Sequence, residues 1–225
     1  MKKLAVLFAC VLALSSCVYT FNGNKGKSVT CKGPVVTRTF EFADFEAVTI
    51  NGGADIDLFQ GDFKVSVKAN EEVYDYLDYE VIDGVLVIKT KDNLGIRSEE
   101  YDITVSLPFL TALTVNGAGE VEIVNGYTSD KDMDITINGA ADIDITGITV
   151  PSLDVVVNGA GDIDVNDMNV ETLSVIISGA GDVDLSGKAG SATLSVSGAG
   201  DIDARGLECT DVKTSKSGLA SIRLK

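Results

Sequence analysis

A seven-residue phrase, Asn-Gly-Ala-Gly-Asp-Ile-Asp, recurs along the chain and is complete at residues 158–164. Six copies with small changes begin at Asn51, Asn116, Asn138, Asn158, Ser178 and Ser197, and a weaker copy begins at Ser217. The steps between successive copies are 65, 22, 20, 20, 19 and 20 residues. A fixed period near 20 residues is typical of repeat architectures, in which each unit stacks on its neighbour. The repeat therefore constrains the fold more tightly than it constrains a function.

Each repeat predicts two short strands joined by a sharp corner. Residues 153–157 precede the glycines and residues 162–165 follow them, and apolar residues alternate with polar ones in both segments, as in half-buried strands. We expect Asn-Gly-Ala-Gly to form the corner, because glycine and asparagine reach positive φ easily and small side chains let coils approach closely. A propeller blade or a sandwich needs more hairpins per unit. The sequence therefore predicts an all-β solenoid, a parallel β-helix with one narrow core.

The stretch at about 58–110 breaks the period. Asp83-Gly84 separates two alternating segments, which predicts a tight hairpin, and residues 71–79 favour a short helix. We expect antiparallel hairpins here that decorate or cap the N-terminal side of a single β-helix domain spanning 40–225. Terminal repeats are expected to be polar so that an open edge does not pair with another chain. At the C-terminal end, bases replace acids at Arg205, Lys213, Lys216, Arg223 and Lys225.

The N-terminus predicts a bacterial lipoprotein signal peptide at residues 1–16. Two lysines precede an apolar run at 4–14 that is too short to span a bilayer. Leu14-Ser15-Ser16-Cys17 follows and is similar to a lipobox, in which Cys17 would be lipidated; an ordinary secretory signal is the alternative. Residues 17–39 would then be a linker. The membrane is thus a predicted partner through the lipid anchor, and the predicted location is the outer membrane of the cell envelope.

Charge and composition limit the classes of partner and of chemistry. Residues 17–225 carry 16 basic and 34 acidic side chains, a net charge of −18, which excludes nucleic acid and anionic lipid surfaces as expected partners. Cations, basic proteins or neutral glycans fit better, and homo-oligomerisation is left open. The chain has no histidine to act as a general base. Cys31 and Cys209 lie at opposite ends of the predicted solenoid, so we do not expect them to pair. No catalytic residue is assigned.

The two acids of each repeat must face solvent, because they alternate with inward residues. Stacking would align them in two columns with neighbours about 4.8 Å apart at the backbone. The columns could serve solubility, bind divalent cations such as Ca²⁺, or recognise a basic or hydroxyl-rich partner. The calcium-binding repeat Gly-Gly-x-Gly-x-Asp is not matched. The candidate ligand or cation ladder comprises Asp142, Asp144, Asp162, Asp164, Asp182, Asp184, Asp201 and Asp203.

The chain resembles the bacterial family described as putative auto-transporter adhesin, head GIN domain. The resemblance covers roughly residues 40–222 and rests on the segments 45–52 and 81–88 and on the repeated Asn/Ser-Gly-Ala-Gly-Asp cores. It implies a right-handed parallel β-helix related in shape to pectin lyases, without the catalytic residues of those enzymes. It also implies a lipoprotein or secreted protein of Bacteroidetes with a role in cell adhesion.

Three functions follow as hypotheses. The leading one is a lipid-anchored, non-enzymatic envelope module that acts as an adhesin or binds a ligand. The second is a periplasmic structural or envelope-stress scaffold; residues 18–25 contain no acid, which leaves the membrane face undecided. The third is a polysaccharide-active β-helix enzyme that uses a carboxylate pair. The third is disfavoured because the acids repeat with the same spacing in each unit, so no pair stands out as a catalytic site. Apart from Ca²⁺, no cofactor is predicted.

Overall fold

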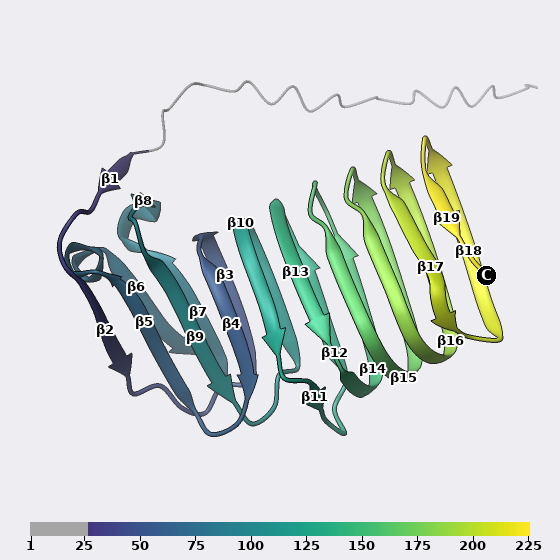
Figure 1. The fold of residues 1–225 in the computed structure, drawn as a ribbon, viewed down its shortest axis with the longest axis horizontal. Coiled ribbons are helices and arrows are strands. Elements are labelled where there is room, and N and C mark those ends of the chain that lie inside the picture. Colours follow the sequence, from purple (N-terminus) through teal and green to yellow (C-terminus); the bar gives the residue numbers. More distant parts are fainter. Residues whose placement is uncertain (1–26) are drawn as a thin grey trace, which may run out of the picture.

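The computed structural model describes residues 27–225 and is a parallel β-solenoid of about six turns (Figure 1). The fold class expected from the repeat is therefore confirmed. The predicted signal peptide and Cys17 lie outside the described residues.

The N-terminal part of the fold contains short strands and two 3-10 helices. They are β1 (Ser28–Thr30), β2 (Val35–Phe40), β3 (Ala47–Gly53), β4 (Asp55–Gln60), β5 (Lys64–Asn70), η1 (Glu71–Asp75), β6 (Leu77–Ile82), β7 (Val85–Thr90), η2 (Lys91–Asn93), β8 (Gly95–Arg97) and β9 (Tyr101–Leu107). Strands β1 and β2 fall within the expected linker at 17–39. The folded part therefore begins earlier than expected, because β2 pairs antiparallel with β5.

The regular part of the solenoid follows. Its strands are β10 (Ala112–Val124), β11 (Tyr127–Thr128), β12 (Met133–Ile137), β13 (Ala140–Thr146), β14 (Ile148–Val157), β15 (Ile163–Gly179), β16 (Val183–Gly198), β17 (Asp201–Glu208), β18 (Asp211–Gly218) and β19 (Ser221–Arg223). All pairings among these strands are parallel.

Alternate residues of each strand fill one continuous core. Leu153, Val155 and Val157 of β14 are fully buried, and each lies in register with an apolar residue of β15. Burying one such side chain stabilises the fold by roughly 1.5–3 kcal/mol. The same inward positions recur in every coil, so the core is a column of stacked aliphatic side chains that leaves the intervening residues to face outward.

The corners need glycine at the second position of the phrase. A Cβ placed on Gly198, whose φ is +141°, would lie 2.0 Å from the carbonyl oxygen of Gly179 in the preceding coil. The expectation that the asparagines share this conformation is wrong: Asn138, for example, is absent from the residues with positive φ. Glycine alone makes the corner, because only a residue without Cβ permits this backbone approach. The asparagine side chains have another role, described below.

The N-terminal coils are stacked out of sequence order. Strands β7 and β9 pair parallel with β3 and β4 on one side, and β10 pairs with β3 and β4 on the other. The 65-residue step of the repeat is therefore an excursion, after which Asn116 lies in register with Asn51. Residues 58–110 thus contribute a coil as well as the expected antiparallel region.

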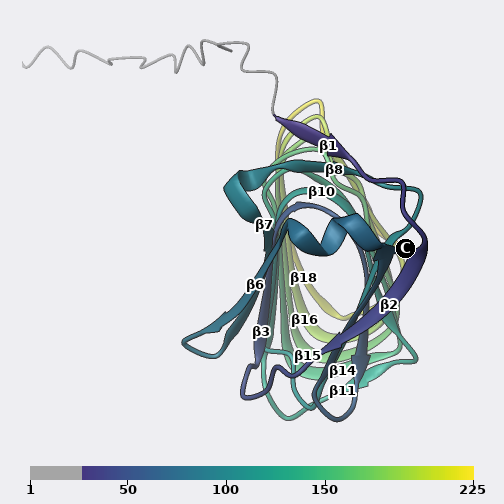
Figure 2. The same cartoon turned by 90° about the vertical axis from the view of Figure 1, so that its left-hand side faces the viewer.

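Antiparallel strands and a helix close this end. Strand β5 pairs with β9, and β6 pairs with β7 across the Asp83-Gly84 turn. Figure 2, in which this end faces the viewer, shows helix η1 lying across the mouth of the coil. Its Val73 side chain is fully buried, so the core does not meet solvent here. The helix is shorter than the segment 71–79 that was expected, because β6 begins at Leu77.

The C-terminal coil ends the solenoid with polar side chains. Thr214 and Lys216 of β18 lie in register with the buried Leu194 and Val196 of β16, yet both are exposed. An inward-pointing lysine disfavours the addition of another strand. The polar terminal repeat expected from the sequence is therefore present.

Candidate functional site

The structure brings the predicted acidic residues into two columns on the outside of one sheet. Asp144, Asp164, Asp184 and Asp203 follow one another in register, and Glu122 precedes them. From Glu120 onward, the acids of the two columns are exposed, apart from the partly exposed Asp201 and Asp203 of β17. The expected alignment of the columns is therefore observed, while their role in binding stays a prediction.

The first column, which contains the fifth residue of each copy of the phrase, links neighbouring coils at their corners; the second column contains the seventh residue, such as Asp164. The Asp182 amide donates a hydrogen bond of 3.1 Å to Oδ1 of Asp162, and the Asp201 amide donates one of 2.9 Å to Oδ1 of Asp182. Asp142 and Asp55 accept equivalent bonds. Each of these carboxylates thus accepts a hydrogen bond from a backbone amide of the next coil, where the chain leaves the corner. The sequence reasoning missed this structural role, because it depends on the path of the backbone through the corner.

Within the described residues, no carboxylate of the second column accepts a hydrogen bond from a backbone amide of the next coil; Asp203 accepts one of 3.1 Å from the Arg205 amide of its own strand. Partial burial, and then the neighbouring Asp184, Asp144 and Asp162 carboxylates, raise the pKa of Asp164. At the C-terminal end, the Arg205 guanidinium binds the Asp203 carboxylate and holds its pKa down at about 2. The column is thus a row of like charges that is neutralised at its last member.

The described part of the chain contains no preformed metal site. Within residues 27–225, no group of three or more His, Cys, Asp or Glu side chains is arranged to hold a metal ion. Calcium binding by the columns stays an untested prediction of the sequence.

A ladder of asparagines runs beside the acidic columns. Nδ2 of Asn116 donates to Oδ1 of Asn51 at 2.8 Å, Asn138 donates to Asn116 at 2.9 Å, and Asn158 donates to Asn138 at 3.0 Å. Every amide donates toward the N-terminal end. We define the asparagine ladder as these four residues. The ladder explains why asparagine opens the phrase in the first four copies, and stacking of identical residues is the sequence signal that could have found it.

A second row of outward side chains carries no charge. We define the neutral row as the residues in register with Thr49 on the same sheet face. Ile176 is the most apolar exposed member, at 41% exposure. The adjacent outward row contains Asp134 and Asp154. The members of the neutral row are Val87, Thr49, Thr114, Thr136, Val156, Ile176, Ser195 and Ser215.

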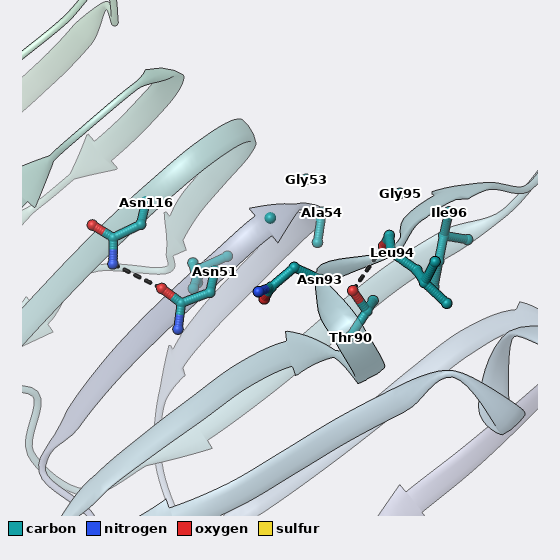
Figure 3. Close-up of a pocket in the computed structure, with 11 residues that line it drawn as sticks. Asn51, Gly53, Ala54, Thr90, Asn93, Leu94, Gly95, Ile96 and Asn116 are labelled. Carbon is teal, nitrogen blue, oxygen red and sulfur yellow. Dashed lines mark hydrogen bonds between the residues drawn. The ribbon is translucent and has the colours of Figure 1, made fainter. Parts of the chain in front are cut away.

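A cavity of about 640 Å³ lies at the N-terminal end of the asparagine ladder (Figure 3). We call it the notch. The corner of the first repeat forms one wall and the loop after β7 forms the other. Its lining residues are Ile50, Asn51, Gly52, Gly53, Ala54, Thr90, Asn93, Leu94, Gly95, Ile96 and Asn116. The notch could not be predicted from the sequence, because it depends on how residues 90–96 meet a corner about 40 residues earlier in the chain.

Cys31 and Cys209 do not form a disulfide, as expected from the sequence. Both thiols are free, Cys31 buried and Cys209 partly exposed. Burial, and then the Glu72 and Asp75 carboxylates, raise the pKa of Cys31, which suppresses the reactive thiolate.

No helix within residues 27–225 has the length and apolar character needed to cross a membrane.

These features define a parallel β-solenoid with repeated polar faces. The chain belongs to the family described as putative auto-transporter adhesin, head GIN domain, whose model matches residues 44–225. The resemblance noted in the sequence is therefore confirmed. A search of curated proteins finds no match.

Solved structures share the fold. A putative adhesin from Bacteroides fragilis has a TM-score of 0.72 at 19% identity and covers 88% of this chain and 100% of its own. A putative adhesin from Parabacteroides distasonis has a TM-score of 0.75 at 24% identity, with 88% and 85% covered. A putative lipid binding protein from the same species has a TM-score of 0.60 at 20% identity, with 88% and 100% covered. At these identities the likeness shows the fold alone.

Proposed function

We propose that this chain is a lipid-anchored, non-enzymatic adhesion or ligand-binding module of the bacterial cell envelope. Membership of an adhesin-like family supports the envelope setting. The observation that carries the binding role is the neutral row, which repeats outward Thr, Val, Ile and Ser side chains from coil to coil beside the asparagine ladder.

A repeated face suits an extended partner. Neighbouring coils place equivalent side chains about 4.8 Å apart, so a polymer could contact several coils at once. Weak contacts that are linked in this way add up to a stable attachment. Hydroxyls and amides on the face supply both donors and acceptors, and the exposed Ile176 supplies apolar area.

The acids favour a non-enzymatic role. A catalytic carboxylate pair works because the two environments push the pKa values apart and place the groups at a defined separation. Here the column members occupy nearly equivalent positions in successive coils. The low pKa of Asp203 follows from its bond to Arg205, and the raised pKa of Asp164 follows from partial burial and like charges. Neither shift separates an acid from a base within one site.

The anchor is argued from the sequence. The basic start, the short apolar run and Cys17 in a lipobox-like setting would attach the mature chain to a membrane. The absence of acids at 18–25 leaves the membrane face undecided between the adhesin and the periplasmic scaffold, so a direct test of the face separates them.

Protease treatment of intact cells that express the full chain provides that test, together with attachment of the same cells to immobilised neutral polysaccharides. We expect the domain to be cleaved without permeabilisation and the cells to attach. A Cys17→Ser variant should leave the membrane fraction and abolish attachment. If the domain resists protease until the outer membrane is opened, the adhesin proposal fails in favour of the periplasmic scaffold.

A further inference from the structure

We propose that the notch is a binding site for a short neutral oligosaccharide. This inference rests on the proposed function and deepens it, because it names a ligand class and a place for it. Three properties of the notch support it: its position in the stack, its unused hydrogen-bonding groups and its lack of charge.

The notch exists because one corner has a neighbour on one side only. Strand β3 stays in register with β10 as far as Gly53, opposite Ala118. On its other side, the register with β7 stops at Asn51, opposite Lys89. The chain then turns through η2 and leaves as β8, which pairs with β1. On the β7 side, therefore, no coil covers the Gly52-Gly53 corner, and the cavity lies where the corner of a further coil would be.

The asparagine ladder ends in the notch with a donor still available. Each ladder amide donates to the residue on its N-terminal side, and Asn51 is the last member. Nδ2 of Asn51 has no protein acceptor among the described residues. Figure 3 shows the Asn93 amide pointing toward Asn51 from the opposite wall. The Asn93 side chain likewise makes no hydrogen bond within residues 27–225. Because Oδ1 of Asn51 already accepts from Asn116, the groups left for a ligand are Nδ2 of Asn51 and the whole amide of Asn93.

The loop that carries Asn93 is fixed in an uncommon conformation. Asp92 and Asn93 both have positive φ, at 54° and 51°. The Thr90 hydroxyl donates a 2.7 Å hydrogen bond to the Leu94 carbonyl oxygen and so closes the loop. Residues other than glycine rarely adopt this conformation, and Asp and Asn are the most frequent exceptions. The loop thus holds Asn93 in place over the notch.

The chemistry of the walls selects a neutral, hydroxyl-rich ligand. None of the residues that line the notch is acidic or basic, although the chain carries 34 acidic side chains. A cation would lack a counter-charge there, and an anion would meet the negative field of the whole molecule. Asparagine amides donate and accept, which matches sugar hydroxyls. Leu94 and Ile96 offer apolar area to the C–H face of a sugar ring. The volume falls within the usual range for small-ligand sites.

The experiment is ligand-observed NMR on the mature chain in detergent, with cellobiose, maltose and chitobiose as neutral probes and a glucuronate disaccharide as the anionic probe. Each probe is present at about 10 mM, where a millimolar site is well occupied. We expect at least one neutral probe to bind and the anionic probe not to bind. Asn93→Ala should weaken binding by about tenfold, the loss of one to two hydrogen bonds. The matched control is Asn169→Ala, which removes an exposed asparagine outside the notch and should bind like the wild type.

Three results would overturn the proposal: no neutral probe binds, Asn93→Ala binds as tightly as the wild type, or the anionic probe binds equally well. Circular dichroism of both variants guards against a loss caused by unfolding, and Asn93→Gln, which keeps the amide but displaces it, should recover part of the affinity. Cell attachment separates the two proposals. If cells attach although the notch binds no sugar, the adhesion function is supported and the proposed sugar site is overturned. If the notch binds a sugar but the cells fail to attach, the sugar site is supported and the adhesion function fails.

Discussion

Glycine at the corner answers two separate demands, a positive φ and the close approach of the next coil. Gly198 faces both, because its Cβ would lie 2.0 Å from the Gly179 carbonyl oxygen. Gly52 faces only the first: its φ is +133°, and a Cβ there would meet nothing within 4 Å. We expect Gly52→Ala to lower the free energy of unfolding by about 1–3 kcal/mol. Gly198→Ala should cost about 1–3 kcal/mol more because of the clash. Urea denaturation of the two variants measures this difference, and equal costs would contradict the steric account of the corner.

Asparagine at the first position contributes through its ladder bonds. Asn138 both donates to Asn116 and accepts from Asn158. Asn138→Ala removes both contacts, and we expect the free energy of unfolding to fall by about 1–2 kcal/mol. Asn169→Ala, at an exposed position outside the ladder, is the control and should change stability by less than about 0.5 kcal/mol. If thermal melts place both variants at the same Tm, the ladder is not a source of stability.

At the scale of the strands, the two acidic columns should behave differently although they carry the same charge. Asp162 accepts a hydrogen bond from the Asp182 amide, whereas Asp164 is flanked by the like charges of Asp144 and Asp184. Asp162→Ala and Asp164→Ala each remove one negative charge. We expect Asp164→Ala to be more stable than Asp162→Ala by about 1–2 kcal/mol at low salt, because only Asp162→Ala leaves an amide without its acceptor. Denaturation at low and high salt checks this, since screening should shrink only the contribution from charge. Equal stabilities at low salt would mean that the columns are equivalent.

The last rung of the second column gives a pH dependence of known sign. The bond to Arg205 lowers the pKa of Asp203 from 3.8 to about 2. The unfolded chain therefore binds the proton more readily, and the stabilisation is present above about pH 4 and is lost as the pH falls through about 2. The raised pKa of Asp164 acts in the opposite direction. Arg205→Gln should thus be less stable than the wild type at pH 6 and equal to it near pH 2. A stability difference that does not change with pH would contradict the pairing.

The strands and their inward residues could be predicted from the sequence because period-two alternation depends on neighbouring residues alone. The alignment of Asp144 with Asp164 and Asp184 followed directly from the repeat period. The order of the N-terminal coils could not be predicted, since β7 and β9 stack on β3 and β4 through pairings that are distant in sequence. The carboxylate–amide bonds of Asp162 and the notch at Asn51 were missed for a related reason. Both depend on backbone geometry at the corners. The sequence shows which residues occupy a corner, but it does not show which groups they contact.

At the scale of the whole molecule, the solenoid separates structure from surface. Inward aliphatic side chains, corner glycines, the asparagine ladder and the first acidic column hold the coils together. The neutral row, the second acidic column and the notch are available to a partner. The negative charge of the molecule then excludes anionic partners from most of the surface, while the uncharged face near the notch stays open to neutral ones.

In the proposed role, these surfaces bind a partner without catalysing a reaction. The direct measurement incubates the full chain in detergent with an array of immobilised polysaccharides and records bound protein and released reducing ends in the same wells. We expect binding to at least one neutral polysaccharide, with no release of reducing ends above the blank. Release of reducing ends would contradict it in favour of a polysaccharide-active enzyme, and the absence of any binding would contradict it in favour of a structural scaffold.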